Sequence, residues 1–300
     1  MSDAIQAEGV RITNPDKTLW PDMGVTKREL AEYYRAVADT MLPRVRDRPL
    51  MLLRCPSGTE DQCFYQKHAK DSVPDAVPRV DVPEKAGRAT YLYVNGVVAL
   101  MGLVQLGTLE LHVWSARRDR LDRPDRLIFD LDPDEELPFG RVVAAALTMR
   151  DLLDDLGLES FAKLTGGKGL HVVAPIERRT GWDEARAFAR AMAERVEGED
   201  PDGYTTANEK EKRKGKVFID YLRNARNATT IADLSPRARD GAPVAVPIAW
   251  DDVDPRQKKP PRVGLREVPD RIAGADPWEG IDGVRQSITS GMREEMGLQG

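Results

Sequence analysis

Two aspartates occupy alternate positions near the end of the segment DRLIFDLDPD, residues 125–134. Side chains alternate between the two faces of a β-strand, so Asp130 and Asp132 would share one face while Phe129 and Leu131 point into the core. Two neighbouring carboxylates repel each other, and a divalent cation between them removes that cost. Oxygen ligands of this kind suit Mg²⁺ or Mn²⁺. A solvent-facing acidic turn would have the same spacing, so the pair alone leaves both interpretations open.

A third carboxylate, Asp220, lies in VFIDYL, residues 217–222, a segment that is otherwise mostly apolar. A strand this apolar is expected to be buried on at least one face, and a buried carboxylate is costly unless it is paired or binds a metal. Three carboxylates on two strands resemble the two-metal sites that activate a hydroxyl group and stabilise a leaving pyrophosphate. We therefore expect Asp130, Asp132 and Asp220 to be catalytic and to bind two divalent cations, Mg²⁺ or Mn²⁺.

The glycine-rich segment TGGKGLH, residues 165–171, brings together the hydroxyl group of Thr165, the ammonium group of Lys168 and the imidazole of His171. Backbone N–H groups of such loops can approach phosphate oxygens, although this segment lacks the GK[ST] ending of a Walker A loop. A plain turn would also contain these glycines. The loop and the histidine together favour a triphosphate site.

Three further residues are of types that bind phosphate. His112 lies on the polar side of the alternating segment LELHVW, and Arg54 and Arg237 lie in LLRCP and LSPRAR. Arginine can hold a phosphate through two parallel hydrogen bonds. Ordinary salt bridges would explain each arginine equally well when it is considered separately.

Lys27 follows the sequence pattern of a helix start, in which Thr26 is the N-cap and Glu29 completes a capping box. The helix dipole disfavours a positive side chain in the first turn. Breaches of local rules of this kind tend to mark functional sites. A phosphate anion at this end of the helix would satisfy both the free N–H groups and the lysine.

Helical and extended patterns alternate irregularly, which favours an α+β fold with mixed or antiparallel sheets flanked by helices. Helices are expected over residues 26–41, 94–106, 139–156, 182–196 (capped by Thr180) and 281–296. Strands are expected over residues 48–54, 108–114, 126–132, 170–174 and 217–222, with an edge strand within 69–90 and another strand near 243–250.

The composition is that of a globular protein, with 41% hydrophobic residues in a chain of 300. Neither a membrane-spanning run nor a signal peptide is recognisable, so we expect a cytoplasmic protein. We expect Cys55 and Cys63 to be reduced; a partial zinc site that includes His68 is the less favoured alternative. The net charge of −5 argues against general attraction to nucleic acid, although a local basic groove is compatible with it.

The order of these motifs resembles the polymerase domain of the bacterial non-homologous end-joining ligase, which belongs to the archaeo-eukaryotic primase superfamily. The resemblance covers residues 10–255 and is carried by TNPDKTLWP, GVTKRELAEYYRAVA, RPLMLLRCPSG, FYQKHA, FDLDP, GGKGLH, VFIDYLRN, SPRAR and the stretch APVAVPIAW. It implies a primase-polymerase fold with an RRM-like catalytic half. We expect a single polymerase domain over residues 1–300, with an N-terminal module at 1–107, a catalytic module at 108–240 and a wrapping segment at 241–300.

The resemblance also implies roles for individual residues. Asp130, Asp132 and Asp220 match the metal ligands of the family. The positions around the incoming nucleoside triphosphate are matched by Arg54, His112, Thr165, His171 and Arg237, with Thr165 in place of the usual serine. Lys17 and Lys27 match a pocket for a 5′-phosphate across a gap. Phe64 and Tyr65 match an aromatic pair that stacks on the template; adjacent residues of a strand cannot both face the core, so one ring should be free to stack.

The implied activity is template-directed nucleotide addition, with a preference for ribonucleotides, at gaps or broken ends during DNA repair. The expected partners are DNA with a 5′-phosphate end, nucleoside triphosphates, a DNA ligase and an end-binding protein. The chain is expected to be a monomer, either free-standing or part of a longer ligase. A metal-dependent nuclease or phosphohydrolase and a non-catalytic DNA-end-binding module are the alternatives. The three carboxylates favour an enzyme over a binding module, and the loop at residues 165–171 favours a triphosphate substrate over water as the reaction partner.

Overall fold

The computed structural model describes residues 3–298, and within them the chain divides into two compact units. Unit 1 comprises Met1–Asp119, Thr229–Val246 and Arg262–Asp276, and unit 2 comprises Arg120–Ala228, Pro247–Pro261 and Pro277–Gly300. Each unit is assembled from several segments of the chain, so the units differ from the continuous modules expected from the sequence. The clearest difference is the strand that contains His112, which belongs to the sheet of unit 1.

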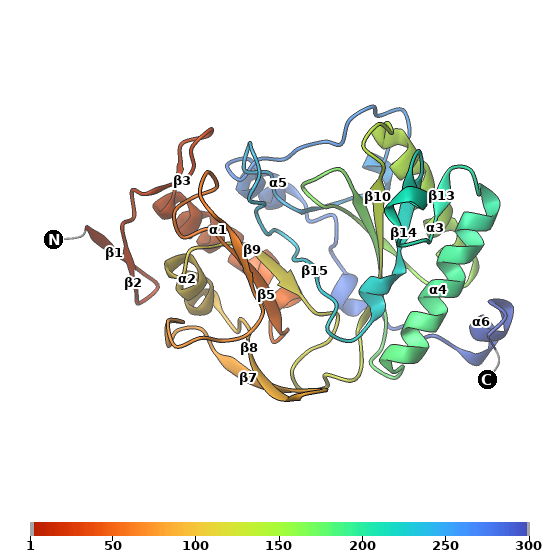
Figure 1. Ribbon diagram of the computed structural model, residues 1–300, viewed down its shortest axis with the longest axis horizontal. Coiled ribbons are helices and arrows are strands. Elements are labelled where there is room, and N and C mark those ends of the chain that lie inside the picture. Colours follow the sequence, from red (N-terminus) through yellow and green to blue (C-terminus); the bar gives the residue numbers. More distant parts are fainter. Residues whose placement is uncertain (1–2, 299–300) are drawn as a thin grey trace. The chain divides into compact units, whose positions relative to one another are not determined.

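Unit 1 is built around a four-stranded antiparallel sheet with the strand order β15-β9-β5-β6. These strands are Thr230–Ile231 (β15), Thr108–Val113 (β9), Leu50–Arg54 (β5) and Phe64–Gln66 (β6). Helices α1 (Lys27–Val45) and α2 (Val97–Gln105) pack on each other, α2 packs on β9, and the short α5 (Val268–Gly274) packs on α1 (Figure 1). The two-stranded sheets of this unit are β1 (Ala4–Ala7) with β2 (Val10–Thr13), β3 (Thr18–Trp20) with β4 (Val25–Thr26), and β7 (Arg79–Glu84) with β8 (Gly87–Leu92).

Helix α1 begins as its sequence predicts. The Thr26 hydroxyl oxygen accepts a hydrogen bond from the backbone N–H of Glu29, and the Glu29 carboxylate accepts one from the backbone N–H of Thr26. This capping box satisfies two donors that a helix start otherwise leaves unpaired. The helix continues through Pro43 to Val45, beyond the predicted end, and its buried side extends to Arg44 and Val45.

Unit 2 contains a six-stranded sheet with the order β13-β14-β10-β12-β11-β16. The strands are Tyr204–Thr205 (β13), Val217–Asp220 (β14), Arg126–Pro133 (β10), Leu170–Pro175 (β12), Phe161–Leu164 (β11) and Val246–Ile248 (β16). Figure 1 shows α3 (Phe139–Asp155) and α4 (Trp182–Glu199) along one side of β10 and β14. The remaining elements are α6 (Ser290–Glu295) and the 3₁₀ turns η1 (Lys210–Arg213), η2 (Tyr221–Asn224), η3 (Trp250–Asp252) and η4 (Ile281–Gly283).

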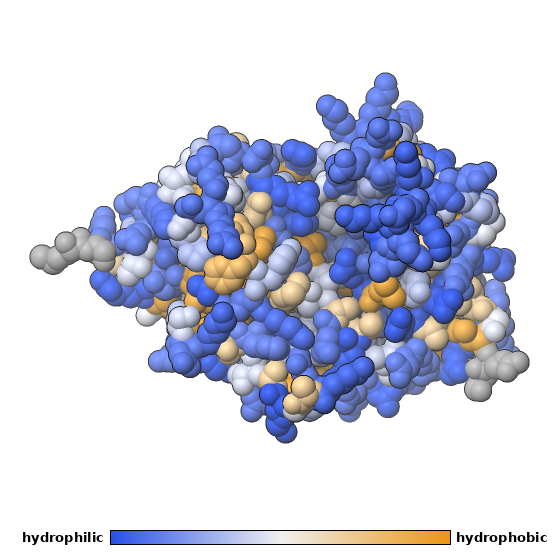
Figure 2. Space-filling view, viewed as in Figure 1, coloured by the Kyte–Doolittle hydropathy of each residue, from blue (hydrophilic) through white to orange (hydrophobic). Residues whose placement is uncertain are grey.

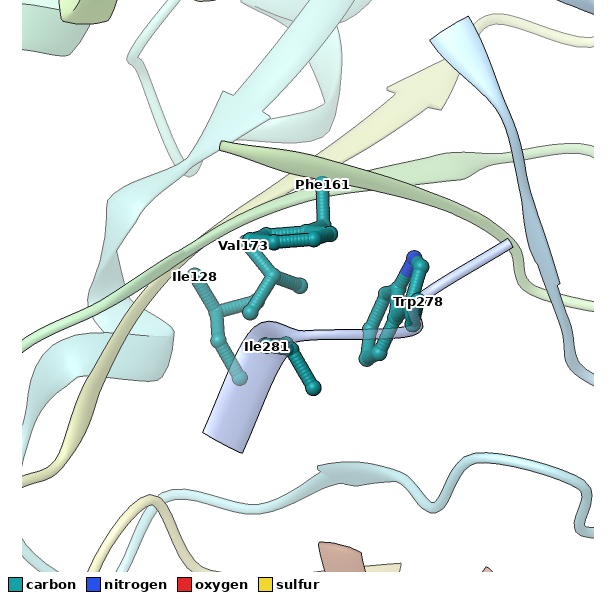
Figure 3. Close-up of a cluster of buried hydrophobic side chains, with 5 residues drawn as sticks. All are labelled: Ile128, Phe161, Val173, Trp278 and Ile281. Atoms are coloured by element: carbon teal, nitrogen blue, oxygen red, sulfur yellow. The ribbon is translucent and has the colours of Figure 1, made fainter. Parts of the chain in front are cut away.

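The other face of the unit 2 sheet is partly covered by the C-terminal segment. Ile128 and Val173 are opposite one another on β10 and β12, and Phe161 is opposite Val173 on β11. Trp278 and Ile281 pack on these three side chains, as Figure 3 shows. The Trp278 indole N–H also donates a hydrogen bond of 2.8 Å to the Ala162 carbonyl, which fixes the ring on the sheet.

Most of the predicted elements are present, and the α+β class is confirmed. Three details were wrong. Residues 69–90 contain a hairpin rather than a single edge strand, and the helix predicted over 281–296 is a 3₁₀ turn followed by the short α6. Helix α4 has Gly181 rather than Thr180 as its N-cap. The sequence patterns also missed several strands of two to four residues, which are too short to show a period: β1, β2, β3, β4, β11, β13 and β15.

Cys55 and Cys63 form a disulfide, so the expectation of reduced thiols is wrong for this structure. The bond joins the end of β5 to the start of β6 across a separation of eight residues. His68 lies elsewhere, against the ring of Tyr91 and 3.4 Å from a Glu84 carboxylate oxygen. The partial zinc site proposed for these three residues is therefore not formed.

Opening the disulfide is expected to lower the free energy of unfolding by about 2–3 kcal/mol, because the closed loop restricts the unfolded chain. Thermal unfolding should be followed with and without dithiothreitol, using a Cys55→Ser/Cys63→Ser variant as the control. The untreated wild type should melt at the highest temperature, and the variant should not respond to the reductant. Equal midpoints for the reduced and untreated wild type would contradict the prediction.

The face of the molecule in Figure 2 is mostly hydrophilic, with hydrophobic residues in small separate groups. The large apolar side chains exposed among residues 3–298 are Met23, Phe64, Tyr65 and Val98. No helix in this part of the chain is long and apolar enough to cross a membrane.

Candidate active site

Charged side chains form one row across the sheet of unit 2. The strand register places Asp220 of β14 opposite Asp130 of β10, Asp130 opposite His171 of β12, and His171 opposite Lys163 of β11. Residues opposite one another in antiparallel strands project on the same side of the sheet. Asp132 lies two positions beyond Asp130 and therefore shares this face, as predicted, while Phe129 and Leu131 are buried on the other.

Opposite and like charges in this row act on its aspartates in different ways. His171 Nε2 lies 3.2 Å from Asp130 Oδ1. Burial opposes ionisation of Asp130, but His171, Arg223 and Lys163 together outweigh it and lower the pKa of that carboxyl. The Asp130 charge in turn raises the pKa of Asp132, at the exposed end of the strand, to about 7. The pair therefore carries the like-charge repulsion expected from the sequence.

Arg223 was not singled out from the sequence, yet its guanidinium group bridges two of the predicted metal ligands. Its Nε lies 3.2 Å from Asp130 Oδ2 and 3.0 Å from Asp220 Oδ2. Although burial opposes it, these carboxylates raise the pKa of Arg223. The only signal in the sequence is its position three residues after Asp220, where η2 turns the chain back toward the sheet.

The donor set fits the predicted cations only in part. Within residues 3–298, no three His, Cys, Asp or Glu side chains are arranged to hold one metal ion. The guanidinium group of Arg223 lies between Asp130 and Asp220, where it neutralises the carboxylates that a cation would otherwise bridge. The oxygen donors and the unrelieved repulsion at Asp132 fit Mg²⁺ or Mn²⁺. Metal binding at Asp130 and Asp220 requires Arg223 to release them.

The glycine-rich loop between β11 and β12 closes on itself. The Thr165 backbone N–H and hydroxyl group both donate to the Gly169 carbonyl, at 3.3 and 3.0 Å. Gly169 lies so close to β10 that a side chain on it would meet both Asp132 Oδ1 and the Leu131 carbonyl at 2.7 Å. Lys168 is exposed. The loop thus brings Thr165 and His171 to the same part of unit 2 as the aspartates.

A second charged cluster lies in unit 1 and is centred on Glu110, which the sequence did not single out. Glu110 Oε2 lies 2.9 Å from His112 Nε2, and Oε1 lies 3.1 Å from Arg237 Nε. Oε1 also accepts a hydrogen bond of 2.9 Å from the Ala238 backbone N–H. Burial alone would raise the pKa of Glu110, but the bond from His112 and the charge of Arg237 hold it at about 2.

Arg54 and the aromatic pair lie on the same sheet as His112. The Arg54 guanidinium donates to the Leu106 carbonyl and to Gln66 Oε1, and it lies over the Phe64 ring at 5.1 Å. Burial lowers the pKa of Arg54. Tyr65 instead presents its edge to the His112 ring, with the ring centroids 5.9 Å apart. Both aromatic rings are exposed, Phe64 by 37% and Tyr65 by 60%, so the alternation predicted for this pair leaves two rings accessible rather than one.

Lys17 and Lys27 form a pair of like charges at the start of α1. The Lys27 ammonium group donates to the Thr13 carbonyl and to both oxygens of Gln105, at 2.9–3.2 Å. Burial and the charge of Lys17 lower the pKa of Lys27 to about 8. Lys17 donates to the Pro56 carbonyl beside the disulfide. These acceptors explain why a lysine is tolerated in the first turn, so its position alone does not indicate a phosphate site.

The predicted site residues therefore form two sets, one in each unit. The set in unit 2 consists of Asp130, Asp132, Thr165, Lys168, His171 and Asp220. The set in unit 1 consists of Lys17, Lys27, Arg54, Phe64, Tyr65, His112 and Arg237. Glu110 and Arg223 are the charged residues that organise these sets and that the sequence patterns did not identify.

The chain is similar to known proteins of DNA end joining. The family model of the LigD primase-polymerase domain matches residues 26–278. The multifunctional non-homologous end joining protein LigD of Pseudomonas aeruginosa is 40% identical over 292 residues, which are 96% of this chain and 35% of that protein. The bifunctional LigD protein of Bacillus subtilis is 30% identical over 246 residues, 81% of this chain and 39% of its own length. The chain thus spans about a third of the length of these curated relatives.

Among solved structures, the polymerase domain from Mycobacterium tuberculosis Ligase D in complex with DNA has a similar fold. Its TM-score is 0.85 at 33% sequence identity, over 91% of this chain and 98% of that chain. The family model covers most of the chain, and the structural agreement extends over nearly all of the polymerase domain. The chain belongs to the family of LigD primase-polymerase domains.

Proposed function

We propose that this chain is a polymerase domain that adds nucleotides to a primer at gaps or broken ends of DNA during end joining. The observation that carries the proposal is the row of Asp220, Asp130 and His171 on one face of the sheet, with Asp132 beside it. We extend it to ribonucleotides as preferred substrates and to a ligase and an end-binding protein as partners of a cytoplasmic monomer. In this proposal residues 1–300 act as one polymerase domain.

Asp130, Asp132 and Asp220 are the residues that would hold two divalent cations, Mg²⁺ or Mn²⁺. When bound, such cations lower the pKa of an attacking hydroxyl group and neutralise a leaving pyrophosphate. His171 contacts Asp130 from the neighbouring strand, with 3.2 Å between its Nε2 and Asp130 Oδ1, and orients its carboxylate. Arg223 balances the charge of Asp130 and Asp220 until they bind the cations. Thr165 and Lys168 of unit 2 are proposed donors for a triphosphate, and His112 and Arg237 are those proposed in unit 1.

The proposal is tested by primer extension on a gapped duplex. Wild-type protein with Mg²⁺ or Mn²⁺ should add the nucleotide that is complementary to the template, and ribonucleotides should be used at lower concentration than deoxynucleotides. Cleavage of the DNA or of the triphosphate without extension would instead favour a nuclease or phosphohydrolase. Binding of DNA ends without any turnover would favour a non-catalytic module.

Lys17 and Lys27 are proposed to bind the 5′-phosphate across the gap, because an anion would relieve the repulsion between them. Below pH 8 Lys27 is mostly protonated, and its positive charge is lost as the pH rises through that value. The phosphate loses its second proton near pH 6, so the attraction should be greatest between these values. The preference for a 5′-phosphate over a 5′-hydroxyl end should be about tenfold at pH 7 in low salt and smaller at pH 9.5.

Fluorescence anisotropy of labelled gapped DNA measures this preference directly. Lys17→Ala should reduce it at pH 7, whereas Arg35→Ala, an exposed change on the same helix as Lys27, should leave it intact. Lys27 is not replaced, because its ammonium group supports Thr13 and Gln105. Equal binding of both DNA ends by the wild type at pH 7 would refute the phosphate pocket.

A further inference from the structure

Glu110 is a buried carboxylate between a histidine and an arginine, yet no step of the proposed reaction uses it. It is 2% exposed and lies on β9, two positions before His112 and on the same face. Oε2 is hydrogen-bonded to His112, and Oε1 accepts a hydrogen bond from the Ala238 N–H and forms an ion pair with Arg237. All three distances are 2.9–3.1 Å, so both oxygens of the carboxylate are fully engaged within unit 1.

The segment that carries Arg237 approaches β9 in an unusual way. Pairing of β15 with β9 ends at Ile231, and the next backbone bond runs from the Ala232 N–H to the Leu111 carbonyl. Leu234 then adopts a left-handed conformation, with φ of 60°, which turns the chain out of the strand. The Ser235 hydroxyl, rather than a backbone carbonyl, accepts the hydrogen bond from the Leu111 N–H.

Glu110 continues this replacement of backbone by side-chain acceptors. Its carboxylate accepts a hydrogen bond from the Ala238 N–H, in place of a backbone acceptor on a neighbouring strand. The same carboxylate forms an ion pair with the Arg237 side chain. The left-handed conformation of a non-glycine residue such as Leu234 is costly, and it persists only where surrounding contacts enforce it. Tyr33 supplies one such contact, because its hydroxyl group donates to the Leu234 carbonyl at 2.7 Å. The position of Arg237 thus depends on Glu110.

The same carboxylate fixes His112. An imidazole bonded to Glu110 through Nε2 has only Nδ1 left for a ligand, and the Tyr65 ring lies against it from the side. Without the carboxylate, His112 and Arg237 would lose the acceptor that they share, and their positive charges would repel each other when the imidazole is protonated. One buried group therefore sets the direction of both side chains.

We propose that Glu110 is a positioning residue of the triphosphate site, which holds His112 and Arg237 in the orientation that meets the phosphates. This inference rests on the nucleotide-binding role proposed above for these two residues. Glu110 does not touch the nucleotide, since its oxygens are occupied by His112, Arg237 and the Ala238 N–H. Its negative charge would repel the phosphates, but Glu110 contacts His112 and Arg237 directly, so we expect the loss of positioning to dominate.

Glu110→Gln tests the inference with the smallest change of shape. The glutamine oxygen can keep the partners of Oε1, but its NH₂ group then faces His112 Nε2, and Arg237 loses its counter-charge. Removal of a charge-assisted bond is expected to raise KM for the nucleoside triphosphate about tenfold, with kcat nearly unchanged. Glu32→Gln, an exposed change in unit 1, is the matched control and should leave KM unchanged.

A mutant cycle separates positioning from a structural role. In a His112→Ala/Arg237→Ala background, Glu110→Gln should change KM by less than about twofold, because it acts through the residues already removed. A full tenfold effect in that background, a fall in kcat instead of a rise in KM, or a lowered KM would each overturn the inference. Glu110→Asp keeps the charge, and a smaller rise in KM provides the same test if the glutamine variant does not fold.

Failure of the proposed triphosphate site gives a different result. If His112→Ala and Arg237→Ala each leave KM for the nucleotide unchanged, these residues do not bind the triphosphate, and the role inferred for Glu110 fails with theirs. If both raise KM while Glu110→Gln does not, the site stands and only the positioning role is refuted.

Discussion

Replacement of Asp130 or Asp132 by asparagine should reduce nucleotide addition by about a thousandfold in both Mg²⁺ and Mn²⁺, because each removes one charge from the cation site. Charge stabilisation by bound cations is worth several kcal/mol in such reactions, and about 4 kcal/mol corresponds to three powers of ten in rate. Asparagine keeps the shape of each side chain, so binding of the DNA itself should change little. Single-turnover primer extension at saturating nucleotide measures the loss.

The same substitution at Asp132 should make the metal-free protein more stable. The Asp130 charge raises the pKa of Asp132 to about 7 in the folded protein. A carboxyl group whose pKa is raised by folding lowers the free energy of unfolding as the pH increases from the ordinary pKa of the group to its raised pKa. Asp132→Asn removes this loss, so its advantage in thermal midpoint, measured in EDTA, should be small at pH 4 and larger at pH 7.

Asp183→Asn is the matched control for both measurements. Asp183 lies exposed in the first turn of α4, also in unit 2, and its replacement should leave extension unchanged. Near-normal extension by either the Asp130 or the Asp132 variant would remove these residues from the cation site. An advantage of the Asp132 variant in thermal midpoint that is the same at pH 4 and at pH 7 would show that the repulsion is relieved in another way.

The acidic face was predictable because strand geometry is local. A period of two residues puts Asp130 and Asp132 on one side of β10, and the apolar neighbours of Asp220 mark β14 as a buried strand. The capping box of α1 is equally local, since it needs only Thr26 and Glu29. These features depend on residues a few positions apart, which a single sequence displays directly.

The partners of these residues were not predictable, because they are distant along the chain. Arg237 is 127 residues from Glu110, and no period or spacing connects them. The sequence alone marks Lys27 as unfavourable in the first turn of its helix. In the structure its ammonium group donates hydrogen bonds to Thr13 and Gln105, which are distant in sequence. Arg223 is close in sequence to Asp220, but only the turn at η2 directs it back to two carboxylates. Tertiary contacts thus determine the interaction partners of these residues, which local sequence rules do not predict.

Gly169 is the position in the candidate site where the smallest change should have a large effect. A Cβ atom there would lie 2.7 Å from Asp132 Oδ1 and 2.7 Å from the Leu131 carbonyl. The carbonyl is part of strand β10 and cannot move without shifting the aspartates on either side of it. Glycine is required here because the loop approaches the strand so closely, whatever backbone angle it adopts.

Gly169→Ala should therefore act on stability and on chemistry together. Overpacking of this kind costs about 1–3 kcal/mol of folding free energy. A displacement of reacting groups by about 1 Å lowers the rate roughly a hundredfold, so extension should fall far more than the loss of folded protein explains. Denaturant unfolding and single-turnover extension on the same preparation measure the two effects.

Gly198→Ala provides the matched comparison. Gly198 lies in α4 with nothing within 4 Å of an added Cβ, and alanine is the better helix former by about 1 kcal/mol. This variant should be at least as stable as the wild type and fully active. If Gly169→Ala behaves in the same way, the loop can move away from β10 without cost, and the close contact with Asp132 does not hold the carboxylate in place. If it unfolds early but keeps its rate, the contact supports the fold alone. Only the combined loss in the first variant, against no loss in the second, assigns Gly169 to the geometry of the acidic face.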